Sequence, residues 1–324
     1  MTDFNFEEKV SIVIPVYNGS NFLKEAIDSA VSQSYNNKEI IVVNDGSDDG
    51  GKVERIARSY NDSINYYEKK RGGVSSALNY GIKRMSGNFF AWLSHDDIYE
   101  RNKIEKQLGF LKLKGIEACY TKVNIINRDG KVIGKDKSNW YPRKKAIIKI
   151  LKRNYINGSS VMMTNKCLKK TGLFNEDLLF TQDNEMWIRI LQNYEMGLLN
   201  DFLIKYRFHK DQGTIKKGKV VKNEAQRMYK EIFDKIIIEE LIINKKEKNR
   251  LKSEAKALTW FADVMSVNRS WYTFSEDYYA RSLLLWNSLL NMARVRKFIG
   301  IRNILIPLRI VKKLIYLYKK LINQ

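Results

Sequence analysis

The chain has few cysteines and few prolines. The first shortage bears on disulfides and zinc sites, and the second on how domains are connected. Its two cysteines, Cys119 and Cys167, lie far apart and belong to no Cys-x-x-Cys or Cys/His spacing. This pattern argues against a disulfide framework and against a structural zinc site, and it fits a reducing compartment. Only three prolines occur among 324 residues, and no Gly/Ser-rich linker interrupts the chain. We therefore expect any two domains to abut.

Long apolar runs are also missing. No stretch reaches the ~18 uninterrupted apolar residues that a membrane-spanning helix needs. The first ten residues, MTDFNFEEKV, are acidic and lack the apolar core of a secretory signal. We therefore expect a cytoplasmic protein.

Acidic residues are far outnumbered. The chain has 36 Asp and Glu against 58 Lys and Arg, which gives a formal net charge of +22. Such a charge calls for an anionic partner: nucleic acid, an anionic lipid surface or a phosphate-bearing substrate. Charge alone does not choose among these three.

Over the first hundred residues, short β-branched runs alternate with helical spacing of apolar residues. Strands are predicted at 10–16, 39–43, 64–67 and 88–93, and helices at 22–31 and 74–85. Near-continuously apolar strands separated by helices predict a parallel sheet covered on both faces. Ligands of such sheets bind beyond the carboxyl ends of the strands. The acidic loops at 44–47 and 94–97 should therefore meet in one crevice.

The pattern changes after residue 118. Predicted elements are a hairpin at 118–134 with an Asp-Gly turn, a basic helix near 144–153, strands at 158–163 and 196–208, and a helix at 183–194. Beyond about residue 220 the chain is predicted to be helical. We expect one domain at 1–218, in which these elements complete the sheet, and a basic α-helical region at 219–324.

The end of the chain is a predicted basic amphipathic helix. No acidic residue follows Asp277, and Arg309, Lys313 and Lys320 share one stripe of the last helix. Such a helix suits an anionic membrane surface. The alternative is that it packs on the rest of the chain or forms a homo-oligomer.

Seven segments resemble, in order, the signature blocks of family-2 glycosyltransferases. They are VSIVIPVYNG (10–19), VVNDGSDDG (42–50), RGGVSSALNYGI (71–82), LSHDD (93–97), GSSVMM (158–163), TQDNEMWIRI (181–190) and YRFHKD (206–211). The resemblance implies the GT-A fold, an α/β architecture with a Rossmann-like mixed sheet flanked by helices. It implies an inverting glycosyltransferase that moves a sugar from a nucleotide-sugar, by family habit a UDP-sugar, to a hydroxyl group. The acceptor would be a glycan or lipid-linked glycan of bacterial surface-polysaccharide biosynthesis, met on the inner face of the cell membrane.

The resemblance also assigns a donor site. The residues implied to bind the nucleotide-sugar are Pro15, Val16, Tyr17, Asn18, Asp45, Arg71 and Asp96. Asp45 would accept a hydrogen bond from the base, Tyr17 would stack on it, and Asp96 would reach the ribose. Arg71 opens a Gly-rich loop before a helix, an arrangement that suits a diphosphate. The purely structural alternatives are an ordinary turn at Asp45 and an aromatic residue at a strand end at Tyr17.

A divalent cation, Mn²⁺ or Mg²⁺, is implied as well, because a cation held by carboxylates would neutralise the charge of the leaving diphosphate. Asp97 is the implied metal ligand, and His209 matches a position that in some relatives helps to hold the metal. Ser94 stands where relatives often have a first aspartate. Asp97 could instead cap a helix, and His209 could be purely structural.

Asp183 is the candidate catalytic base, because an inverting transferase needs one carboxylate to take the proton of the attacking hydroxyl. Glu185 is the competing assignment, and Gln182 replaces the glutamate that usually precedes the base. On the resemblance alone, Ser159 and Ser160 would lie near the acceptor. Trp187 would line the acceptor site or belong to the core.

Three other classes fit parts of the sequence. A nucleic-acid-binding protein would explain the charge, but no recognition motif is present, so we expect no nucleic-acid partner. A nucleotidyltransferase would carry a Gly-rich basic loop after the first strand, where this chain has residues 17–20, YNGS. A catalytically silent scaffold of the same fold remains open because of Ser94 and Gln182.

Overall fold

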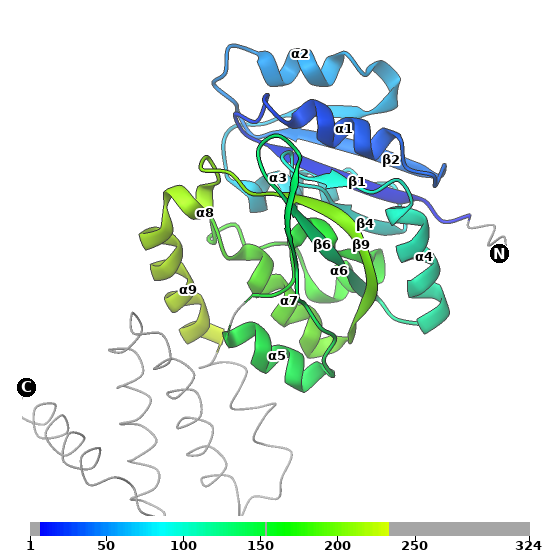
Figure 1. The fold of residues 1–324 in the computed structure, drawn as a ribbon, viewed down its shortest axis with the longest axis vertical. Helices are drawn as coiled ribbons and strands as arrows, with labels where there is room; N and C mark the ends of the chain where they lie inside the picture. The colour runs from blue at the N-terminus through cyan, green and yellow to red at the C-terminus, as the bar shows by residue number, and fades with distance from the viewer. Residues whose placement is uncertain (1–6, 153, 233–324) are drawn as a thin grey trace, which may run out of the picture. The chain divides into compact units, whose positions relative to one another are not determined.

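A computed structural model describes residues 7–152 and 154–232 (Figure 1). The helices predicted further along, including the basic amphipathic end, lie outside the described residues. The elements, in chain order, are β1 (Val10–Val16), α1 (Leu23–Val31), β2 (Lys38–Asn44), α2 (Lys52–Arg58), β3 (Asn65–Glu68), α3 (Val74–Ile82), β4 (Phe89–Trp92), β5 (Ile98–Tyr99), α4 (Lys103–Lys114), β6 (Ala118–Ile126), β7 (Val132–Lys135), α5 (Arg143–Lys152), β8 (Met162–Thr164), α6 (Asn165–Thr171), α7 (Gln182–Asn193), β9 (Met196–Arg207), α8 (Gly213–Lys216) and α9 (Gly218–Ile232).

The first half of the sheet is parallel, as predicted. Strands β3, β2, β1 and β4 lie side by side in that order, all parallel. Every residue of β1 is buried, because helices cover both of its faces. α1 packs on the face that presents Ile12 and Ile14. On the other face, α3 comes so close that a Cβ on Gly81 would lie 2.5 Å from Val13.

The second half makes the sheet mixed. β8 runs antiparallel to β4 and β6, and β9 runs parallel to β6 with two register shifts. The short β5 follows β4 closely in sequence but pairs with β9 at the far edge of the sheet. The loop between β4 and β5 must therefore cross to the end of β9. That crossing brings residues 94–97 next to residues 206–209.

One sequence-based prediction needs correction here. The strand predicted at 158–163 is a 3₁₀ turn, Gly158–Ser160, followed by the short β8. The turn forms because Gly158 lies against the indole of Trp92, where a Cβ would come within 2.6 Å of the ring. The helices α2 and α6 and the strand β5 were not predicted, since each is short.

The chain divides into two compact units, Met1–Glu224 and Ala225–Gln324. The first unit contains the whole described sheet. Of the second unit, only the end of α9 is described. Within the described ranges, no helix is both long and apolar enough to span a bilayer.

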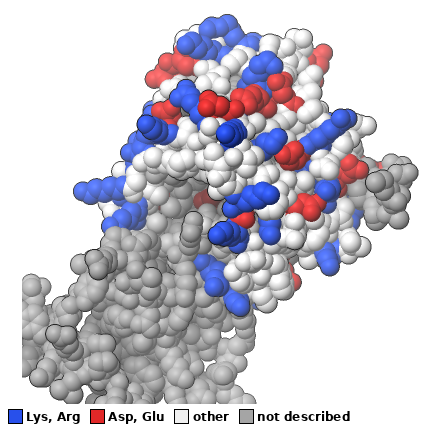
Figure 2. Space-filling view, viewed as in Figure 1, with Lys and Arg blue, Asp and Glu red and all other residues white. Residues whose placement is uncertain are grey.

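On the face shown in Figure 2, basic side chains are spread out rather than gathered in one stripe. Asp and Glu side chains lie between them. The net charge of +22 therefore does not, on this face, mark a single binding surface.

Candidate active site

A large cavity opens beyond the carboxyl ends of β1, β2 and β4. Its volume is about 1830 Å³, and both predicted acidic loops line it, through Asp45 and through Asp96 and Asp97. Parallel strands end at one edge of a sheet, so the loops that follow them share a crevice. The predicted convergence of the two loops is confirmed.

The loop after β1 is held by the loop after β2. Asn18 adopts a left-handed backbone, with φ 51°. Its backbone N–H donates to Ser47 Oγ (3.0 Å), and its side-chain oxygen accepts from the backbone N–H of Asp48 (2.9 Å). Pro15, Val16, Tyr17 and Asn18 thereby form one wall of the cavity.

Asp45 organises the Gly-rich loop. Its side chain is buried and accepts hydrogen bonds from Lys69 Nζ (2.8 Å) and from the backbone N–H groups of Gly72 (3.0 Å) and Gly73 (2.6 Å). Both carboxylate oxygens are thus already bonded within the protein. Base recognition by Asp45 stays a prediction; the structure shows a carboxylate that fixes the loop at Arg71–Gly73.

Arg71 covers the ring of Tyr17. The guanidinium lies 4.1 Å from the ring centroid, a cation–π distance, and the arginine is exposed at the cavity edge. One face of the Tyr17 ring therefore carries an arginine, and stacking of Tyr17 on a base stays a prediction. The pair places a positive charge and an aromatic surface at the same point of the wall.

Asp97 lines the cavity, and the metal-ligand role expected of it stays a prediction. Asp97 is 2% exposed. Its Oδ2 accepts from Ser159 Oγ (2.6 Å) and its Oδ1 accepts from the backbone N–H of Arg207 (3.0 Å). Burial, followed by the charge of Asp96, raises the pKa of Asp97 well above its usual value. Asp97 ties the β4–β5 loop to its neighbours.

Asp96, by contrast, is partly exposed and meets His209. The two side chains are 3.0 Å apart, between Asp96 Oδ2 and His209 Nε2. Burial would raise the pKa of Asp96, but the neighbouring His95 and His209 outweigh it and hold that pKa below its usual value. The other ring nitrogen of His209 is buried and has no hydrogen-bond partner in the described part of the chain. The pair is thus a carboxylate and an imidazole in one corner of the cavity.

Arg207 supports this corner, and the sequence analysis did not single it out. Its side chain is 1% exposed. It donates from Nε to the backbone oxygen of Asp96 (3.0 Å), from Nη1 to that of Arg128 (2.6 Å) and from Nη2 to Glu25 (2.7 Å). A buried, fully bonded arginine fixes the backbone on which Asp96 stands.

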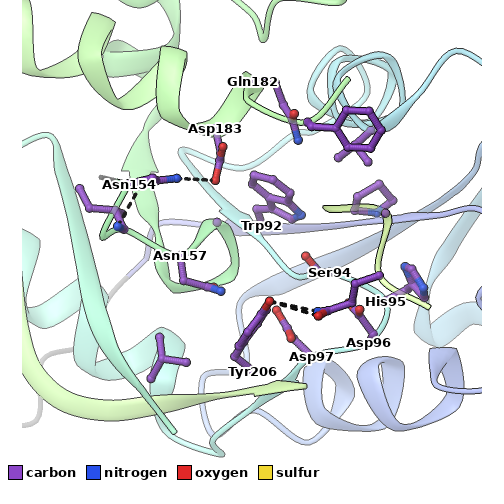
Figure 3. A pocket seen from close by; sticks show the side chains of 18 of the residues that line it. Trp92, Ser94, His95, Asp96, Asp97, Asn154, Asn157, Gln182, Asp183 and Tyr206 are labelled. Atoms are coloured by element: carbon purple, nitrogen blue, oxygen red, sulfur yellow. Dashed lines mark hydrogen bonds between the residues drawn. The ribbon is translucent and has the colours of Figure 1, made fainter. Parts of the chain in front are cut away.

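Asp183 lies across the cavity from Asp96 and Asp97 (Figure 3). It opens α7, and its carboxylate accepts from Asn154 Nδ2 (2.9 Å) and from the backbone N–H of Asn184 (2.7 Å). Burial raises its pKa to about 6. A carboxyl group with that pKa can accept a proton near neutral pH. Glu185 instead pairs with Arg189 (2.6 Å) and does not line the cavity.

Three expected acceptor residues do not face the cavity. Ser159 and Ser160 are buried; Ser159 donates to Asp97, and Ser160 Oγ donates to the backbone oxygen of Asn157 (2.6 Å). Trp187 is wholly buried, with its ring packed on Phe174. None of the three lines the cavity, so an acceptor role for them is not supported. Their segments carry apolar neighbours that draw them into the core.

A different set of residues lines the cavity beside Asp183. Asn154 bonds Asp183, and the adjacent Tyr155 meets the ring of Tyr141 edge-on at 5.6 Å. Lys149 Nζ lies 5.3 Å from the Tyr141 ring centroid. These residues make a continuous aromatic and basic wall, here called the tyrosine wall: Tyr141, Lys149, Asn154 and Tyr155.

Comparison with known proteins agrees with this geometry. Residues 11–168 match the family model for glycosyl transferase family 2. An uncharacterized glycosyltransferase of Rickettsia typhi is 43% identical over 219 residues, which are 66% of this chain and 68% of that protein. Another, from Rickettsia conorii, is 44% identical over 238 residues, 72% of this chain. The chain spans only 39% of the length of that second relative.

Two solved structures and a further relative have known ligands or substrates. TarS 1–349 of S. aureus in complex with UDP has a TM-score of 0.56 at 15% identity, over 83% of this chain and 87% of that one. Mannosyltransferase PcManGT from Pyrobaculum calidifontis, in complex with GDP-Man and Mn²⁺, has a TM-score of 0.54 at 16% identity, over 91% and 84%. An Escherichia coli enzyme, UDP-Glc:alpha-D-GlcNAc-diphosphoundecaprenol beta-1,3-glucosyltransferase, is 29% identical over 65% of this chain and 80% of that protein.

The mixed sheet, the acid-lined cavity and these matches define a glycosyltransferase with the GT-A fold. The chain belongs to glycosyltransferase family 2. The resemblance on which the sequence analysis relied is therefore confirmed.

Proposed function

We propose that the protein is an inverting, metal-dependent glycosyltransferase that uses a UDP-sugar. The observation that carries the proposal is the pairing, in one cavity, of Asp183, whose pKa is raised to about 6, with the Asp96–His209 corner. A catalytic base on one side of the cavity, and a corner on the other side that would hold a cation for the leaving diphosphate, suit a single displacement at the anomeric carbon.

In this reaction Asp183 takes the proton of the acceptor hydroxyl while that oxygen bonds to the anomeric carbon. The bond from the anomeric carbon to the donor diphosphate breaks, and the diphosphate leaves with the electron pair. The attack comes from the face opposite the leaving group, so the configuration inverts. Asn154 and the Asn184 N–H hold the carboxylate of Asp183 for this transfer.

The Asp96–His209 corner fits a divalent cation, Mn²⁺ or Mg²⁺. A cation would be held there by Asp96 Oδ2 and His209 Nε2, which lie 3.0 Å apart. No group of three or more His, Cys, Asp or Glu side chains within residues 7–152 and 154–232 forms a complete metal site. These metals commonly take one or two protein ligands and complete their shell with substrate phosphates and water. When bound, the cation would neutralise charge on the leaving diphosphate.

We assign the metal to Asp96 rather than Asp97, since both oxygens of Asp97 accept hydrogen bonds within the protein. The nucleotide would lie along the wall of Pro15, Val16, Tyr17 and Asn18, with Asp45 and Arg71 beside it. The UDP bound to TarS supports a uridine donor, and the Mn²⁺ bound to PcManGT supports the cation.

For the acceptor we propose a lipid-linked glycan with a diphosphate linker. Its sugar would pack on the tyrosine wall, and its anionic group would meet Lys149, Lys135 and Lys137, which also line the cavity. Among the described residues, no carboxylate pairs with these three lysines. The diphosphoundecaprenol-linked acceptor of the E. coli relative supports this choice.

Such an acceptor would require the protein to work at an anionic membrane surface, on the inner face of the cell membrane. α8 and the start of α9 expose Ile215 (43%) and Val220 (49%) next to Lys216 and Lys217, and both lysines line the cavity. Exposed apolar side chains next to lysines suit the interface of an anionic bilayer. The division into regions 1–218 and 219–324 stays a prediction.

The test is turnover. The protein with Mn²⁺ is incubated with UDP-, GDP- and dTDP-sugars, with and without membrane lipid extract, and release of the nucleoside diphosphate is measured. We expect release from UDP-sugars only, lost in Asp183→Asn and kept in Asp62→Asn, an exposed control before β3. Equal release by wild type and Asp183→Asn would refute the base, and no release from any donor would favour a silent scaffold.

A further inference from the structure

Glu224, on α9, bonds the segment that leads into α7. Its carboxylate is 8% exposed and accepts from the backbone N–H groups of Leu179, Phe180 and Thr181 and from Thr181 Oγ1, each at 2.8 Å. Four short hydrogen bonds from one segment to one carboxylate are charge-assisted and make the contact specific.

The contact replaces a cap that α7 lacks. Thr181 is the N-cap residue of α7, and its side chain makes no capping bond within the helix. The backbone N–H of an N-cap residue has no partner within its helix, and a negative charge at that end is favourable. Glu224 supplies both from a helix that begins after β9. Without it, three backbone N–H groups would lose their acceptor.

The capped segment carries the base. Asp183 follows Thr181 by two residues, and Leu179 and Phe180 line the cavity beside it. The segment is held on its other side by α3: Ser75 Oγ donates to the backbone oxygen of Leu178 (3.0 Å), and Asn79 bonds the backbone of Phe174 in both directions. The approach to Asp183 is therefore fixed between α3 and Glu224.

We propose that Glu224 is a positioning residue that holds the first turn of α7, and with it Asp183, in the reactive orientation. The inference rests on the proposed role of Asp183 as the base. Glu224 touches neither substrate nor the reacting atoms; it acts through the backbone at 179–181. It makes α9 part of the active-site framework, although α9 follows the last strand among the described residues.

The charge of Glu224 also acts on the base. Two titratable groups that interact electrostatically with Asp183 are Glu224 on α9 and Tyr206 on β9. Burial is the main reason that the pKa of Asp183 is raised to about 6, and the negative charge of Glu224 adds to it. A carboxylate that does not interact with Asp183 would leave the titration of Asp183 unchanged when its charge alone is removed.

The first variant is Glu224→Gln, with Glu231→Gln as the matched control. Glu231 lies on the same helix, is exposed and loses the same charge. The glutamine oxygen can keep the bonds made at Oε1, but its NH₂ group then faces the Leu179 N–H. We expect kcat to fall by about 10- to 100-fold, since small misplacement of a reacting group costs that much. The KM for the UDP-sugar should stay within about twofold, because the proposed donor wall is elsewhere.

The discriminating readout is the pH profile of kcat/KM. In Glu224→Gln its acid limb should move to lower pH, and in Glu231→Gln it should stay near pH 6. Thr181→Val keeps the carboxylate and removes one donor; it should lower kcat by about threefold without moving the acid limb. This milder variant tests the contact if Glu224→Gln does not fold.

The outcomes separate two failures. Wild-type kcat and an unmoved acid limb in Glu224→Gln, with Asp183→Asn inactive, would overturn the positioning role alone. Full activity of Asp183→Asn would overturn the proposed base and the inference with it. A rise in donor KM without loss of kcat would contradict the inference, because it would place Glu224 in donor binding.

Discussion

Replacing Asp183 by asparagine should inactivate the enzyme and, near neutral pH, relieve a cost to folding. The carboxyl group stands at the start of α7, where burial raises its pKa from 3.8 to about 6. Its two oxygens accept from Asn154 and from the Asn184 N–H. An asparagine fills the same space without a charge, so it removes the base while preserving the shape of the site.

The size and sign of the stability effect follow from the raised pKa. The folded protein holds this proton more tightly than the unfolded chain does. Stability therefore falls as pH rises from about 4 to about 6 and stays lowered above that range. A pKa rise from 3.8 to about 6 corresponds to about 3 kcal/mol, which cavity water screens to about 1–2 kcal/mol. The asparagine also loses one acceptor oxygen, at about 1 kcal/mol at every pH.

The assay is unfolding of wild type and Asp183→Asn at a series of pH values from 4 to 8, with Asp62→Asn as the exposed control. The informative quantity is the change with pH of the difference between mutant and wild type, because the lost hydrogen bond does not depend on pH. We expect that difference to move in favour of the mutant by about 1–2 kcal/mol between pH 4 and pH 7. A difference that does not change with pH across this range would refute the raised pKa of Asp183.

Three further predictions follow from the site and its supports. The kcat/KM of wild type should fall about tenfold for each pH unit below about 6 and level off above it, measured by nucleoside diphosphate release; a flat profile would argue against Asp183 as the base. Gly158→Ala should lower the free energy of unfolding by about 1–3 kcal/mol in thermal or urea unfolding, because its Cβ would lie 2.6 Å from the Trp92 ring, and an unchanged stability would mean that the ring can move. Lys149→Ala should raise the KM for a diphosphate-linked acceptor about tenfold and leave acceptor-free donor hydrolysis unchanged, whereas equal loss of both would place Lys149 at the donor.

Much of the fold could be predicted from the sequence because its signals are local. The buried run at Val10–Val16 and the helical spacing after it are visible in the residues themselves. So are the two acidic loops, whose meeting follows from the parallel order of the strands. The 3₁₀ turn at Gly158–Ser160 could not be predicted, because its cause is the indole of Trp92, far away in the sequence.

The hydrogen-bond partners of the site residues could not be predicted from the sequence for the same reason. Asp96 and Asp97 are neighbours of the same type, and only the fold shows that one is tied to Ser159 and the backbone of Arg207 while the other faces His209. Glu224 is one of 36 acidic residues, and nothing in its own segment indicates that it caps a helix 43 positions earlier. Arg207 belongs to the signature block YRFHKD (206–211), but its burial is visible only in the structure.

Metal-dependent UDP binding is tested by calorimetric titration of the protein with UDP, GDP and dTDP, with and without Mn²⁺, in wild type, Asp96→Ala and Asp97→Asn. We expect Mn²⁺-dependent binding of UDP that disappears in Asp96→Ala and survives in Asp97→Asn, because the buried Asp97 holds the loop rather than the cation. Binding that needs no metal, or that survives in Asp96→Ala and disappears in Asp97→Asn, would contradict this expectation.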